Sequence, residues 1–100
     1  MDCTILFLDS FLQSSDAGFP LVLESEDEVR LELGDFALVP ARGPHEYVDA
    51  SGMVVSSGAA AVRAAPGVWA GGKQMVLITN WDQPTVSLSP GDVVGAVLLD

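Results

Sequence analysis

Short apolar runs separated by turn residues follow one another along this chain of 100 residues. Val29, Leu31 and Leu33 alternate with polar residues, and this period of two is typical of a half-buried strand. Other apolar runs of strand length predict further strands over 4–8, 36–39, 53–55, 74–79, 85–88 and 93–99. The pattern therefore predicts an all-β fold built of short strands and hairpins.

One segment favours a helix instead. Residues 59–65 are rich in alanine, and Pro66-Gly67 would end a helix there. Two helical turns are marginal without tertiary support. We therefore expect at most one short helix in the protein.

A short motif occurs twice. The pattern V-x-L-x-x-G-D at residues 29–35 recurs at residues 86–92, and an apolar run follows each copy. In the second copy, Pro90 and Gly91 occupy the two central positions that a type II turn prefers. The repetition predicts two similar hairpins that pack together.

Composition indicates a folded domain that associates. Hydrophobic residues make up 49% of the chain and charged residues 18%, which excludes a disordered chain. One hundred residues correspond to a single domain over 1–100, and a domain of this size buries only part of its apolar surface. The apolar surplus therefore predicts a homo-oligomer.

The charge excludes some partners. The formal net charge is −10, and the four basic residues Arg30, Arg42, Arg63 and Lys73 are scattered along the chain. Binding to nucleic acid needs a clustered basic face, so we expect no nucleic-acid partner, and an anionic membrane is disfavoured for the same reason. The acidic run at residues 24–28 is either a solvated loop or an interaction patch.

Few residues could carry chemistry. Cys3 and His45 are each the sole residue of their type, which predicts no zinc site, no catalytic cluster and no cofactor. No apolar run reaches membrane-spanning length, and no basic region precedes the first one, so the chain reads as soluble and unprocessed. Trp69 and Trp81 could stack on a base, anchor a partner or fill a core, and Trp81 is the better partner candidate because its loop is polar.

Three stretches carry a family likeness. In chain order they read SDAGFPLVLESEDEVRLELGDFALVP, SSGAAAV and APGVWAGGKQMVLITNWDQPTVSLSPGDVVGAVLL. Their order and spacing resemble the trimeric dUTPases over roughly residues 4–99, with deletions. The resemblance implies the β-clip fold and a trimer.

The residues that the family uses for catalysis are missing from this sequence. Pro20 stands where the resemblance would place an acidic residue, and Ser56 stands where it would place a phosphate-binding arginine. Gly67, Val68, Trp69 and Ala70 occupy the positions of the base and the tyrosine, and Val93 and Ala96 replace an arginine and a glutamine. The family's glycine-rich closing arm would lie beyond Asp100. We therefore expect that the protein is not an enzyme and has no catalytic residues.

A shifted alignment could still supply a carboxylate. Asp16, Asp35, Asp82 and Asp92 all lie near predicted turns. Aspartate is also favoured at turns because its side chain bonds the nearby backbone, so the structural interpretation is preferred for each.

The missing catalytic residues and the apolar composition favour a structural protein that associates. The β-clip fold that the resemblance implies also occurs in short, trimeric capsid decoration proteins of tailed viruses, so by this analogy we expect a trimeric viral capsid decoration protein. It would be located in the virion if viral and in the cytoplasm otherwise. The segment 1–12 is more apolar than one short strand requires, so Ile5 and Phe7, together with Trp81, are the expected partner-binding residues. The alternatives are a β-clip linker or binding module of a retroelement, which residues 76–98 also resemble, and a residual nucleotide binder.

Overall fold

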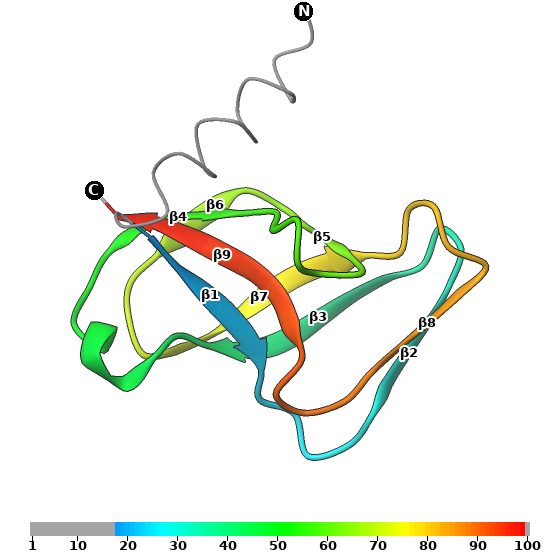
Figure 1. Ribbon diagram of the computed structural model, residues 1–100, viewed down its shortest axis with the longest axis horizontal. Helices are drawn as coiled ribbons and strands as arrows, with labels where there is room; N and C mark the ends of the chain where they lie inside the picture. The colour runs from blue at the N-terminus through cyan, green and yellow to red at the C-terminus, as the bar shows by residue number, and fades with distance from the viewer. Residues whose placement is uncertain (1–17, 100) are drawn as a thin grey trace, which may run out of the picture.

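The computed structural model describes residues 18–99, which form strands joined by turns and short loops (Figure 1). The strands are β1 (Gly18–Leu23), β2 (Val29–Glu32), β3 (Phe36–Arg42), β4 (Gly52–Val55), β5 (Arg63–Ala64), β6 (Gly67–Trp69), β7 (Lys73–Thr79), β8 (Thr85–Leu88) and β9 (Val93–Leu99), and one turn of 3-10 helix, η2, spans His45–Tyr47. The predicted all-β fold is confirmed. The strand predicted over 4–8 lies outside the described residues.

Seven of these strands form one curled antiparallel sheet in the order β5-β7-β3-β1-β9-β4-β6. Strands β2 and β8 pair with each other in a separate ribbon, which Figure 1 shows at one end of the sheet. The side chain of Gln74 on β7, the second strand from one end of this order, joins β7 to β6 at the other end. It donates a hydrogen bond to the carbonyl of Val68 on β6 at 2.6 Å and accepts one from the amide of Ala70 at 3.0 Å. These bonds draw the curled sheet towards a closed barrel.

The core lies inside the curl of the sheet, and the buried apolar residues within 18–99, apart from Val55 and Ala96, form one contiguous cluster. Trp69 is fully buried in this cluster. The ring of Phe19 lies edge-on to Trp69 at a centroid distance of 6.3 Å, and the ring of Tyr47 stacks on Phe19 at 4.7 Å. Gly43 lies so close that an added Cβ would be 2.4 Å from the Phe19 ring. The residue type at position 43 is therefore fixed by the packing of Phe19.

The two copies of the sequence motif occupy equivalent positions. Strand β3 covers residues 36–42 and β9 covers residues 93–99. Each residue of β3 therefore corresponds to the residue of β9 that lies 57 positions later (36 to 93, 42 to 99). Gly34 and Gly91 have positive φ angles of 85° and 94°. Beside them, Asn80 exchanges backbone hydrogen bonds with Gly34 and Asp35, and Leu23 exchanges the same two bonds with Gly91 and Asp92. The two units do pack together, as predicted.

The units are not hairpins, however, which corrects the prediction. β2 pairs with β8 of the other unit rather than with β3, and β3 pairs with β1 and β7. The turn at Gly34-Asp35 directs the chain from the ribbon into the curled sheet.

The segment 59–65, which has helical propensity in the sequence, forms no helix; it consists of turns and bends that lead into β5. The hydroxyl of Ser56 accepts a hydrogen bond from the Ala64 amide at 3.1 Å and donates one to the Ala64 carbonyl at 3.2 Å. Ala64 also pairs with Ile78 on β7. These contacts with distant residues outweigh the helical propensity of a seven-residue segment.

Candidate functional site

Of the three expected partner-binding residues, the structure describes only Trp81. Ile5 and Phe7 lie outside the described residues. Trp81 is 50% exposed in the loop that follows β7, and the guanidinium carbon of Arg63 lies 3.5 Å from the centre of its ring. Such stacking holds an exposed tryptophan in a fixed orientation.

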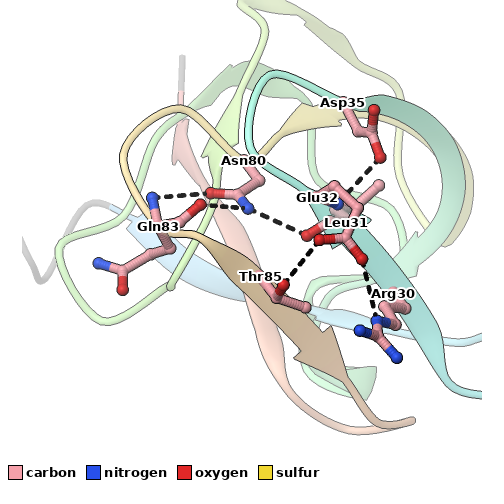
Figure 2. A network of polar contacts seen from close by, with 7 residues as sticks. All are labelled: Arg30, Leu31, Glu32, Asp35, Asn80, Gln83 and Thr85. Atoms are coloured by element: carbon pink, nitrogen blue, oxygen red, sulfur yellow. Dashed lines mark hydrogen bonds and ion pairs between the residues drawn. The ribbon is translucent and has the colours of Figure 1, made fainter.

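Asn80, the residue before Trp81, anchors this loop (Figure 2). Its fully buried side chain donates to the carbonyl of Leu31 at 3.0 Å and to the carbonyl of Gln83 at 2.9 Å, and accepts from the Gln83 amide at 3.0 Å. A buried amide with these partners satisfied ties the loop rigidly to β2. Trp81 is therefore presented at the surface by a fixed loop.

A second set of polar contacts joins β2 to β8 beside Asn80. Figure 2 shows Glu32 at its centre, where its carboxylate accepts from the Thr85 hydroxyl at 2.7 Å and pairs with Arg30 at 3.2 Å. The backbone amide of Glu32 donates to the Asp35 carboxylate at 2.9 Å. These groups are exposed and bond to one another, so they stabilise the ribbon rather than surround a reacting group.

The aspartates that could have rescued catalysis are occupied at turns. Asp35 accepts from the Glu32 amide, and Asp92 accepts from the Ser89 amide at 2.8 Å in the equivalent turn. Asp82 is exposed and receives one long bond from Gln83. The structural interpretation is confirmed for Asp35 and Asp92, while Asp16 lies outside the described residues.

A hollow of about 470 Å³ opens beside Trp81. It is lined by Val55, Ser56, Ser57, Gly58, Ala60, Val62, Arg63, Ala64, Pro66 and Trp81. Val55 and Val62 are buried, and the Ser56 hydroxyl is engaged by Ala64. Arg63 makes no ion pair with any carboxylate of residues 18–99. The hollow therefore offers an apolar floor with one cation at its rim.

The positions that the resemblance assigns to catalysis hold structural residues. Pro20 pairs with Ala96 in the sheet, Ser56 supports β5, and Trp69 fills the core. No three residues among the described His, Cys, Asp and Glu side chains gather closely enough to hold a metal ion. His45 is exposed, and Cys3 lies outside the described residues. Across residues 18–99 no helix is long and apolar enough to cross a membrane.

The outer side of β3 and β7 carries a surface that the sequence analysis missed. Phe36 and Leu38 are 68% and 61% exposed, and Leu77 and Met75 are also exposed on the neighbouring strand. Leu38 lies directly opposite Leu77, and Phe36 lies opposite Thr79, which itself lies opposite Arg63. We call Phe36, Leu38, Met75 and Leu77 the β3–β7 face; it continues through Arg63 to Trp81.

The signal for this face is present in the sequence. Strands β3 and β7 are apolar at both alternating positions, as FALVPAR and KQMVLIT show. A strand with this pattern is usually buried on both sides. One side of these two strands faces the core, and the other remains exposed in the single chain.

Two comparisons of the sequence with known proteins give no match. A scan against models of protein families finds no match, and a search of curated proteins finds no significant match. The resemblance to trimeric dUTPases therefore stays a prediction, and the functional interpretation depends on the geometry of the chain itself.

Proposed function

We propose that this protein is a non-enzymatic structural protein that forms a homotrimer and binds a symmetric protein surface, in particular a viral capsid lattice. The observation that carries the proposal is the exposed β3–β7 face. Four large apolar side chains on adjacent strands are an unusual surface for a monomer of this size, and such patches mark protein–protein contacts.

The size of the face favours association in which several contacts form together. Burying a large apolar side chain contributes about 1.5–3 kcal/mol, and those of the β3–β7 face are already partly buried. Bringing two molecules together costs about 4–15 kcal/mol. One such face is therefore weak alone, whereas a closed ring of three chains forms three contacts and is favoured.

A binding role is also supported by the arrangement around Trp81. A tryptophan held by Arg63 beside an apolar hollow is an anchor of the kind found in the centre of protein interfaces. A trimer would present three such anchors around its threefold axis. On a lattice with threefold symmetry the three contacts form at once, so each can be weak.

Several features argue against catalysis on a nucleotide. Hydrolysis needs cations for the phosphates and a base to activate water. Pro20 and Trp69 occupy the positions that the resemblance assigns to such groups, and Ser56 is committed to Ala64. We expect no hydrolysis of dUTP with Mg²⁺; turnover above background that is lost in Asp82→Asn would contradict this.

The proposal is tested by the mass of the protein in solution. Sedimentation equilibrium at micromolar concentration should give a trimer for the native chain and a monomer for Leu38→Asp. Val48→Asp is the matched control, because Val48 is a similarly exposed apolar residue outside the β3–β7 face, and this variant should remain trimeric. A monomer mass for the native chain would contradict the proposal.

The lattice partner requires a separate test. If the source is viral, purified particles should contain this chain in multiples of three per threefold site. Particles without the chain would contradict the decoration role. A reverse transcriptase encoded in the same reading frame would favour the alternative, a binding module of a retroelement polyprotein.

A further inference from the structure

A second apolar surface lies on the outer side of β9, β4 and β6. Leu98 pairs with Met53, and Met53 pairs with Val68, so the three side chains form one row across the sheet. Met53 is 49% and Val68 75% exposed, while Leu98 is half-buried. We call these three residues the outer row.

The outer row begins where the N-terminal segment joins the sheet. Gly18, the first residue of β1, pairs with Leu98. An added Cβ at Gly18 would lie 2.5 Å from the Val97 carbonyl oxygen, so the backbone packs closely against β9 at this point. Gly18, the first described residue, therefore lies beside the first member of the row.

At its other end the outer row stops at Val68 on β6, whose carbonyl accepts a hydrogen bond from Gln74 on β7. A hollow of about 300 Å³ near this point is lined by Leu38, Met75 and Leu77 of the β3–β7 face and by no residue of the outer row. The outer row is therefore a surface separate from the β3–β7 face.

The segment before Gly18 has a composition that suits the outer row. Six of the nine residues 4–12 are large and apolar, whereas residues 13–17, QSSDA, contain no large apolar residue. We propose that residues 4–12 dock on the outer row of the same chain and that residues 13–17 connect them to β1.

The connection is long enough. Five residues span up to about 17 Å when extended. The row from Gly18 to Val68 crosses three strand spacings, which amount to about 14 Å. Residues 4–12 can therefore reach any point of the outer row without leaving their own chain.

The chain's own segment is a better occupant than a second copy. A second copy would bring another formal charge of −10 to the surface, which opposes association. The tethered segment also has a high effective concentration at the row. In this arrangement Ile5 and Phe7 contact the body of their own chain instead of an external partner. The proposal is independent of trimer formation through the β3–β7 face.

Cys3, the sole cysteine of the chain, allows a direct test. A benzophenone maleimide attached to Cys3 of the full chain is photolysed at submicromolar concentration, and the cross-linked peptides are identified by mass spectrometry. We expect links within one chain to peptides that contain Met53 or Val68. Links to other surfaces, or only between two chains, would overturn the proposal.

Substitutions in the row supply the matched comparison. Val68→Asp should lower the yield of the link to the Met53 peptide at least fivefold, whereas Val48→Asp should leave it unchanged. Both positions are exposed, so neither change should unfold the protein, and the emission of the buried Trp69 reports this. An unchanged yield in a folded Val68→Asp variant would overturn the proposal.

Discussion

The side-chain amide of Asn80 donates a hydrogen bond at 3.0 Å to the backbone carbonyl of Leu31, a residue 49 positions earlier in the chain. Asn80 is the one buried polar residue within 18–99, and it also exchanges two hydrogen bonds with Gln83. A single side chain thus fixes the loop that presents Trp81 and attaches this loop to β2. Loss of Asn80 should affect both stability and the candidate binding site.

Asn80→Leu should destabilise the protein by about 3 kcal/mol, because it removes the three hydrogen bonds that this buried side chain makes with the Leu31 carbonyl and the Gln83 backbone groups. The measurement is the free energy of unfolding in urea. Gln83→Ala is the control, since the Gln83 side chain makes only a 3.4 Å bond to Asp82, and its effect should stay within about 0.5 kcal/mol. A cost below about 1 kcal/mol for Asn80→Leu would show that the network contributes little.

Gly34→Ala and Gly91→Ala should each lower the free energy of unfolding by about 1 kcal/mol, and the two effects should be similar. Both glycines have positive φ, and an added Cβ would meet nothing within 4 Å, so only the backbone conformation opposes the change. Gly58→Ala is the control, because position 58 is also open but its φ is not positive, and this variant should be neutral or slightly more stable. Thermal unfolding of the three variants tests the equivalence of the two turns, and a large cost at only one of them would contradict it.

The sequence predicted the strands that have a clear apolar pattern and missed those that depend on distant partners. β5 and β6 span two and three residues, and their pairing is set by β7 and β4. β1 was missed because Pro20 interrupts its pattern. The missing N–H of the proline is tolerated because β1 pairs with β3 only at Val22 and Leu23, which leaves that side of β1 unpaired at Pro20. β3 was expected to end near Pro40, yet it continues to Arg42.

The candidate site was predictable only in part. The polar sequence around Trp81 correctly indicated an exposed loop, whereas the role of Asn80 depends on a contact with Leu31 that no local pattern shows. The β3–β7 face was missed because a continuous apolar run does not reveal which side of a strand stays exposed. The repeated motif did reveal two equivalent units, but not that β2 would pair with β8.

Gln74→Ala should release β6 from β7 without unfolding the sheet. The Gln74 side chain accepts from the Ala70 amide and donates to the Val68 carbonyl. Loss of these bonds costs about 1 kcal/mol, which corresponds to roughly fivefold faster hydrogen exchange at the Ala70 amide. Exchange at the Ile78 amide, in the buried part of β7, should change much less. Equal acceleration at both amides would indicate global destabilisation rather than local opening.

Self-association should strengthen as salt is added. Three chains with a formal charge of −10 bring about −30 together (three times −10), and this repulsion extends over about 30 Å at 10 mM salt but only about 8 Å at 150 mM. The β3–β7 face contains no charged residue, and the nearest strand pair at one of its ends is Arg42 opposite Lys73. The strength of the apolar contact itself changes little over this range of salt, so screening of the repulsion sets the direction of the effect.

Sedimentation equilibrium at the two salt concentrations should show a larger fraction of trimer at 150 mM for the native chain and no trimer at either concentration for Leu38→Asp. Tighter association at 10 mM would contradict this, because it would mean that ion pairs rather than the apolar face hold the chains together.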